Sequence, residues 1–248
     1  MTILGISCYY HDSSACLIKD GKLVAAVQEE RFDRNKYSSA FPINSINYCL
    51  QSANLTSYDI DYVAFYEKPF LKFERIILNH LRSYPFSLKN FLDTTPHWLK
   101  DRLILPLTLK EELGFKGDVF FIKHHLAHAA STFLTSPFDK AAILTVDGVG
   151  EWATTTYGTG KDNKINVLKE IKYPNSLGLL YSIVTTYLGF RVFSGEGKVM
   201  ALAETGDPKY LDKFKKIISI KDDCSFRLNK KYFYLNKGGL SYTNNFLK

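Results

Sequence analysis

The chain has few cysteines, and they form no pattern that would build a metal ribbon or a disulfide framework. Cys8, Cys16, Cys49 and Cys224 are scattered over 248 residues, and no two of them have C-x-x-C spacing. Zinc ribbons need such pairs, and disulfide-rich secreted domains need a denser set of cysteines. The pattern is typical of free thiols in a reducing compartment, so we expect a cytoplasmic protein.

An export signal and a long apolar run are also missing. Residues 1–5 contain no basic segment, and the longest apolar stretch, residues 177–193, is broken by Ser182, Thr186 and Arg191. A membrane-spanning helix needs about 20 predominantly apolar residues, and a signal peptide needs a basic start. The sequence therefore predicts no membrane partner.

The charge balance is basic, but no nucleic-acid module accompanies it. The formal net charge is +7, and lysines gather late in the chain, within 209–216 and 230–237. A solvated lysine face is the usual origin of such a cluster, and no RNA or DNA motif surrounds it. We expect no nucleic-acid partner. The hydrophobic content of 46% is enough for a globular protein with one large or two ordinary domains.

Two segments share a pattern of three apolar runs separated by two turns, which is typical of consecutive strands. In the first segment the apolar runs lie at 3–8, 15–18 and 23–27, and the turns lie at 9–13 and 20–21. In the second segment the runs lie at 142–146, 154–157 and 165–171, and the turns lie at 147–152 and 160–163. Apolar spacing between the segments predicts a helix at 42–53, strands at 62–66 and 119–122, and aromatic-rich helices within 70–113. The repeat predicts an internal duplication.

The two predicted three-stranded segments each have a turn of small residues after the first strand. This arrangement resembles the α/β architecture of actin, sugar kinases and heat-shock ATPases. The turns are Asp12-Ser13-Ser14-Ala15 and Gly148-Val149-Gly150. In that fold they face each other across a cleft and hold nucleotide phosphates, because short residues let backbone N–H groups approach phosphate oxygens. We predict a division near Pro137, with a first ATPase-like subdomain at 1–137 and an incomplete second one at 138–248.

Three of the six histidines lie within five positions, in Lys123-His124-His125-Leu126-Ala127-His128. If this segment opens a helix, His124 and His128 lie one turn apart on one face and can reach the same ion. Imidazole suits zinc, iron, copper or nickel, but such a site needs a further ligand, usually a carboxylate. His125 stands where H-E-x-x-H metalloproteases have their glutamate, so peptide hydrolysis is not expected. Histidines that cap carbonyls or lie at the surface are the structural alternative.

Eight motifs follow one another along the chain. They are LGIS at 4–7, YHDSSA at 10–15, QEERF at 28–32, FP at 41–42, HHLAHA at 124–129, VDGVGEWAT at 146–154, SLGLLY at 176–181 and GEGKVM at 195–200. In this order they resemble the amino-terminal part of the O-carbamoyltransferases that modify nodulation factors and antibiotics. The resemblance implies an ATPase-like domain that passes a carbamoyl group to an acceptor hydroxyl. It also implies a second domain, absent from this chain, that makes carbamoyl-adenylate from ATP and carbamoyl phosphate.

The resemblance also implies roles for single residues. His124 and His128 match the family's iron ligands, so iron or another divalent transition metal is the expected cofactor, and Mg²⁺ could accompany ATP. The third ligand, an aspartate, is expected beyond Lys248. His11 and Lys36 resemble catalytic positions near the carbamoyl group, where an imidazole can move a proton and an ammonium can steady an oxyanion; a merely solvated Lys36 is the alternative.

Nine further residues resemble positions that bind the nucleotide or the carbamoyl group. They are Ser13, Ser14, His125, Asp147, Gly148, Gly150, Glu151, Glu196 and Lys198. Packing inside the helix is an equal alternative for His125, and mutual neutralisation is an alternative for Glu196 and Lys198.

Three functions follow from these patterns. The leading prediction is the acceptor-transfer part of an O-carbamoyltransferase, which moves a carbamoyl group from carbamoyl-adenylate to a small-molecule or sugar hydroxyl. This part is expected to need the missing carboxy-terminal half or a partner chain and to be inactive alone. A sugar-kinase-like phosphotransferase rests on the duplicated turns and leaves the histidines unused. A non-catalytic nucleotide-binding subunit is the third alternative.

Overall fold

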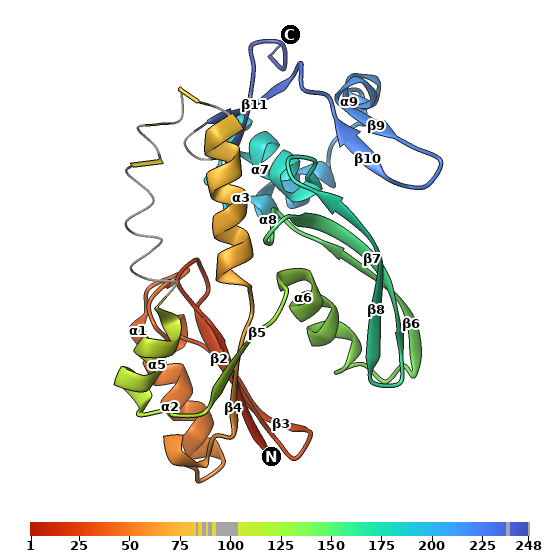
Figure 1. The fold of residues 1–248 in the computed structure, drawn as a ribbon. Helices are drawn as coiled ribbons and strands as arrows, with labels where there is room; N and C mark the ends of the chain where they lie inside the picture. Colours follow the sequence, from red (N-terminus) through yellow and green to blue (C-terminus); the bar gives the residue numbers. More distant parts are fainter. Residues whose placement is uncertain (83, 86–87, 89–90, 93–103, 237–238, 248) are drawn as a thin grey trace. The chain divides into compact units, whose positions relative to one another are not determined.

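The computed structural model describes residues 1–82, 84–85, 88, 91–92, 104–236 and 239–247. The chain divides into two compact units, Met1–Ala127 and His128–Lys248 (Figure 1). Both units combine helices with strands, which confirms the α/β class. The division precedes the predicted one near Pro137, and the assignment of two ATPase-like subdomains, the second incomplete, stays a prediction.

The first unit is built on a five-stranded mixed sheet. Its strand order is β3-β2-β1-β4-β5, in which β1 pairs antiparallel with β2 and parallel with β4. The elements of this unit are β1 (Thr2–Ser7), β2 (Ser14–Lys19), β3 (Lys22–Gln28), α1 (Glu30–Asp33), α2 (Ile43–Ser52), η1 (Ser57–Asp59), β4 (Tyr62–Phe65), α3 (Pro69–Arg82), α5 (Leu105–Leu113) and β5 (Asp118–Phe121).

Alternation along the strands places the core of this unit on one face of the sheet. Leu4 of β1 pairs with Leu17 of β2, and both side chains are fully buried. Helix α2 contacts β2 and β3 and adds Ile46 and Cys49 to the same cluster. Burial of each large apolar side chain stabilises the fold by about 1.5–3 kcal/mol, so this cluster fixes the sheet that carries the turn between β1 and β2.

A buried carboxylate caps helix α2 from a distant part of the sequence. Glu29 is 2% exposed. Its Oε1 accepts hydrogen bonds from the backbone N and side-chain Nδ2 of Asn44 at 3.2 and 2.7 Å, and its Oε2 accepts from the backbone N and Oγ of Ser45 at 2.8 and 2.6 Å. The first amides of a helix have no partner within the helix, and a negative charge is favourable there. Glu29 therefore joins the end of β3 to the start of α2.

The second unit contains a three-stranded antiparallel sheet with the order β6-β7-β8. Helix α6 (His124–Phe133) crosses the division between the units and leads into this sheet. The other elements are β6 (Lys140–Val146), β7 (Ala153–Lys161), β8 (Lys164–Lys172), α7 (Leu177–Tyr187), α8 (Glu196–Ala203), α9 (Leu211–Ile217), and two hairpins formed by β9 (Ile218–Ile220) with β10 (Phe226–Leu228) and by β11 (Phe233–Asn236) with β12 (Gly239–Tyr242).

Helix α6 and β7 meet at a glycine. A Cβ at Gly160 would lie 2.5 Å from a ring atom of Phe133, so no larger residue fits without a shift. The sequence predicted that this strand would end at residue 157, before the two glycines. The strand instead runs through Gly158 and Gly160 to Lys161. The glycines serve close approach here and do not form a turn.

The other predicted strands are found within a few residues of the expected bounds. The helix predicted at 42–53 is α2, and the aromatic-rich stretch 70–113 contains α3 and α5, with its middle part outside the described residues. The two three-stranded segments lie in separate sheets. Their duplication stays a prediction. Among the described residues, no helix combines the length and the apolar character needed to cross a membrane.

Candidate metal and transfer site

Helix α6 presents two histidines one turn apart. It begins at His124, as the sequence predicted, and His124 and His128 share one face because four residues make about one turn. His124 is half-buried and His128 is exposed. The ring of Tyr66, which directly follows β4, meets the His124 ring edge-on, with 5.5 Å between centroids. The helix itself fixes the spacing of the two imidazoles.

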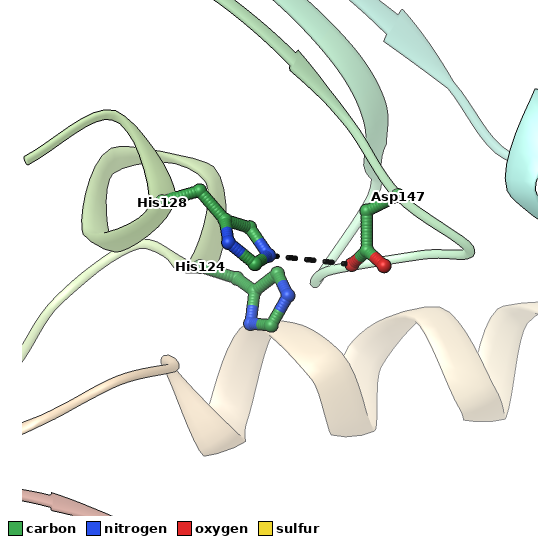
Figure 2. A group of neighbouring side chains, drawn as sticks. All are labelled: His124, His128 and Asp147. Carbon is green, nitrogen blue, oxygen red and sulfur yellow. Dashed lines mark ion pairs between the residues drawn. The ribbon is translucent and has the colours of Figure 1, made fainter. Parts of the chain in front are cut away.

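Asp147, at the end of β6, brings a carboxylate to this pair. Its Oδ2 lies 3.8 Å from Nε2 of His128 (Figure 2). One ligand atom from each of His124, His128 and Asp147 can be chosen so that all lie within 4.8 Å of one another. Oδ1 of Asp147 accepts a hydrogen bond from the backbone N of Gly148 at 2.6 Å. One oxygen thus holds the turn while the other faces the histidine.

The start of helix α7 holds the Asp147 turn in place. Ser176 caps the helix by accepting from the backbone N of Leu179 at 3.0 Å, and its hydroxyl lies 3.1 Å from the carbonyl oxygen of Asp147 and 2.7 Å from that of Gly148. A Cβ at Gly178 would lie 2.6 Å from the carbonyl carbon of Asp147. The helix therefore touches the turn directly, through a residue that must be small.

Two imidazoles and one carboxylate form a donor set that suits iron, zinc and similar divalent metals. Two atoms bound to one ion at about 2.0–2.2 Å are at most about 4.4 Å apart. Small side-chain rotations would therefore bring three atoms that lie within 4.8 Å of one another around a single ion. The residues present therefore fit a transition metal. From the sequence, Asp147 was expected at a nucleotide-binding turn and the third ligand beyond Lys248. In the structure, Asp147 provides a carboxylate within the chain. Its place near the histidines follows from the end of β6 lying near α6, which the sequence does not show.

The predicted catalytic residue His11 lies on the turn between β1 and β2. Tyr9 and Asp12 have φ values of 68° and 53°, in the left-handed region that side-chain-bearing residues rarely adopt. Asp12 Oδ2 lies 2.7 Å from Nδ1 of His11. A carboxylate can only accept, so Nδ1 carries the hydrogen and Nε2 is the basic nitrogen of the neutral ring.

The loop that contains Lys36 is bound to the His11 turn through the main chain. The backbone N of Tyr9 donates to the carbonyl of Ser39 at 3.0 Å, and that of Ser13 donates to the carbonyl of Ser38 at 2.8 Å. Lys36 itself is exposed. The structure thus brings the two predicted catalytic segments together but leaves Lys36 free to be either solvated or engaged by a ligand.

The predicted phosphate-binding turns are largely closed in this structure. In the first turn, Ser13 is fully buried and Ser14 half-buried. In the second, the amide of Gly148 donates to Asp147 and the amide of Gly150 donates to the carbonyl of Ala153 at 2.9 Å. Both glycine amides are therefore used within the turn, and phosphate binding there stays a prediction.

The remaining predicted residues differ in their surroundings. His125 is 4% exposed and Glu151 is 6% exposed, which places both side chains in the protein interior. Glu196 begins α8 and accepts from the hydroxyl of Ser182 at 3.0 Å through Oε1. Lys198 is exposed, so the buried Glu196–Lys198 pair considered as an alternative does not form. The role of His125 in ligand binding stays a prediction.

Comparison with known proteins decides the family. The family model described as "Carbamoyltransferase N-terminus" matches residues 2–246. The chain belongs to this carbamoyltransferase family. The matched residues include both the His11 turn and the segments of His124, His128 and Asp147.

Several relatives are longer than this chain. An uncharacterized protein of Synechocystis is 49% identical over 98% of the chain and 41% of its own length. The nodulation protein NolNO of Sinorhizobium fredii is 36% identical over 89% of the chain and 32% of its own length. The chain thus spans well under half of these relatives. A solved structure, YeaZ from Pseudomonas aeruginosa, is similar with a TM-score of 0.36 and 12% identity over 68% of this chain and 64% of that one, too low to decide the fold.

Proposed function

We propose that this chain is the acceptor-transfer region of an O-carbamoyltransferase, which moves a carbamoyl group from carbamoyl-adenylate to a hydroxyl of a small-molecule or sugar acceptor. The match of the family model over residues 2–246 carries the proposal. The His11 turn and the His124, His128 and Asp147 group supply the chemistry. The donor is made from ATP and carbamoyl phosphate by a region outside this chain, in the same polypeptide or in a partner.

In the proposed reaction the acceptor hydroxyl oxygen attacks the carbamoyl carbon and forms a new C–O bond. The bond between that carbon and the adenylate phosphate oxygen breaks, and AMP leaves with the electron pair. His11 takes the hydroxyl proton at Nε2, and Asp12 on Nδ1 stabilises the imidazolium that results. Lys36 steadies the negative charge that develops on the carbamoyl oxygen.

His124, His128 and Asp147 are the residues that would hold the transition metal. When bound, such an ion acts as a Lewis acid that polarises a carbonyl or binds phosphate oxygens. The carboxylate of Asp147 contributes a negative charge beside two neutral donors. This charge should strengthen the site well beyond what two histidines alone provide.

The family match favours carbamoyl transfer over a sugar-kinase-like phosphotransferase. The phosphotransferase alternative rests on the two turns as phosphate-binding sites. In the second turn, however, the amides of Gly148 and Gly150 already donate within the turn. A non-catalytic nucleotide-binding subunit would leave His11, with its oriented ring, without a task.

The test measures bound metal and carbamoyl transfer on the full-length protein. We expect His124→Ala, His128→Ala and Asp147→Asn each to weaken metal binding at least about tenfold and to lower transfer with it. Asp147→Asn keeps a side-chain acceptor for Gly148 and removes the charge. Asp162→Asn, in the exposed turn between β7 and β8, is the matched carboxylate control.

Elemental analysis and a product assay give the two readouts for each variant. His125→Gln should keep its metal, provided that its thermal unfolding midpoint shows a folded protein. Stoichiometric metal and normal transfer in both His124→Ala and Asp147→Asn would remove the group from the mechanism. Transfer of phosphoryl instead of carbamoyl groups to the acceptor would reject the proposed function itself.

A further inference from the structure

A buried ammonium group lies beneath the His11 turn. Lys72 of α3 is 8% exposed, and its Nζ lies 5.0 Å from the centroid of the Tyr10 ring. A cation at this distance from an aromatic ring is attracted by the negative face of the ring. The attraction is stronger when the cation is withdrawn from water, as it is here.

A carboxylate fixes this ammonium group from the other side. Glu67, between β4 and α3, is 0% exposed, and its Oε2 lies 2.5 Å from Nζ of Lys72. A buried acid of this kind compensates the charge of the lysine and limits where the ammonium can lie. Lys72 is therefore held as a fixed point below Tyr10, although its side chain is long and flexible in solution.

Tyr10 transmits this position to His11. Tyr10 is 51% exposed, so burial among apolar groups accounts for only part of what holds its ring. Its centroid is 4.4 Å from that of the His11 imidazole, with the planes inclined at 47°. The next residue in the chain, Asp12, contacts Nδ1 of the same imidazole through its carboxylate. The imidazole thus lies between a tyrosine ring and a carboxylate.

The backbone of this turn needs such support. Tyr9 and Asp12, the residues on either side of Tyr10 and His11, both have positive φ values. Left-handed conformations of residues with side chains persist where surrounding contacts over-determine them, and they gather at functional sites. The main-chain bonds to Ser38 and Ser39 hold the two ends of the turn, and the contacts of the Tyr10 and His11 side chains lie at its centre.

We propose that Lys72 is a positioning residue for His11, acting through the Tyr10 ring and fixed by Glu67. The role of His11 as the base rests on the proposed function. The geometry of the turn does not, because it can be measured without any reaction. Loss of the cation lets the Tyr10 and His11 rings leave the transfer geometry, and we expect kcat to fall about 5- to 30-fold while KM for the carbamoyl donor stays within about twofold.

The experiment uses the full-length protein. Lys72→Met alone would leave Glu67 buried beside an uncharged chain, so the variant is Lys72→Met combined with Glu67→Gln. Lys72→Arg keeps a cation below the ring, and Tyr10→Phe keeps the ring; each should retain kcat within about threefold. Tyr10→Leu removes the ring without touching the buried pair. Arg82→Met, which removes an exposed cation at the end of α3, is the control.

The structural readout is the NMR signal of the His11 ring in ¹³C-histidine-labelled protein, assigned with His11→Gln. We expect the double variant to move this signal toward its position in Tyr10→Leu, and Lys72→Arg to leave it in place. An unchanged His11 signal in a folded double variant would overturn the proposal. If the double variant does not fold, wild-type kcat in Tyr10→Leu would overturn it instead.

The two proposals fail separately. Normal transfer by His11→Gln would reject His11 as the base and with it that part of the proposed function. The NMR comparison would still decide whether Lys72 sets the position of the His11 ring.

Discussion

Replacement of Glu29 by alanine should strongly destabilise the first unit. The carboxylate accepts four hydrogen bonds from Asn44 and Ser45 at the start of α2 and is 2% exposed. In the variant, two backbone amides lose their acceptor at a buried helix end. Each unsatisfied buried amide costs about 1–3 kcal/mol, while the two side-chain donors can turn to other partners. We expect a loss of about 3–5 kcal/mol, because a negative charge at the helix start is lost as well.

Two further variants make this estimate testable. Glu29→Gln keeps the shape and one acceptor, so its cost should be smaller, about 1–3 kcal/mol. Glu30→Gln is the matched control, since Oε2 of Glu30 accepts from the backbone N of Tyr37 at 3.2 Å in a partly buried position; it should cost less than about 1.5 kcal/mol. Urea unfolding followed by circular dichroism gives the free energies of unfolding.

The same variant should loosen the turn that carries His11. The backbone N of Glu29 donates to the carbonyl of Ser13 at 2.8 Å, so movement of residue 29 reaches the end of that turn. Hydrogen exchange at the Ser13 and Glu29 amides should accelerate in Glu29→Ala. The reasoning fails if Glu29→Ala unfolds at the same urea concentration as Glu30→Gln.

Two other predictions concern the thiols and the Asp147 turn. Burial raises the pKa of the Cys49 thiol to about 11, with Cys16 nearby adding to the shift, so about one thiol in a thousand is ionised at pH 8. Cys224 is exposed and should react with a disulfide reagent within seconds to minutes, while Cys49 should react only in denaturant; rapid modification of Cys49 would contradict its burial. Gly178→Ala should displace Asp147 and weaken metal binding about tenfold, whereas Gly197→Ala, with open space around its Cβ, should bind normally in the same titration.

The positions of most strands along the chain could be predicted because alternation and turn residues indicate them locally. Asp20-Gly21 marked the hairpin between β2 and β3, and Gly21 indeed has a positive φ of 76°. The end of β7 could not be predicted in the same way. Gly160 looks like a turn residue from the sequence, but it lies inside a strand because the ring of Phe133, 27 positions earlier, occupies the space of its side chain.

The candidate metal group was half visible in the sequence. His124 and His128 are related by helical spacing, which a sequence reveals, whereas Asp147 joins them only because β6 ends near α6. A carboxylate next to glycines also suits a phosphate-binding turn, so the sequence led to a nucleotide-binding role for Asp147 and not to a metal-binding one. Glu67 and Lys72 carried no sequence signal, because isolated charged residues are ordinarily solvated. Glu29 stood out only as part of the QEERF motif, which did not reveal that it caps α2.

Ser176, whose hydroxyl bonds to the carbonyl groups of Asp147 and Gly148, is synthesised well after the Asp147 turn. Ser176 lies 29 positions after Asp147 in the chain, so at about 5–20 residues per second the ribosome delivers it roughly 1.5–6 s after the last of the three ligands. A nascent chain can therefore display every ligand before Ser176 reaches the Asp147 turn. A chain cut between β8 and α7 would preserve this early state. Like Gly178→Ala, it separates possession of the ligands from their preorganisation.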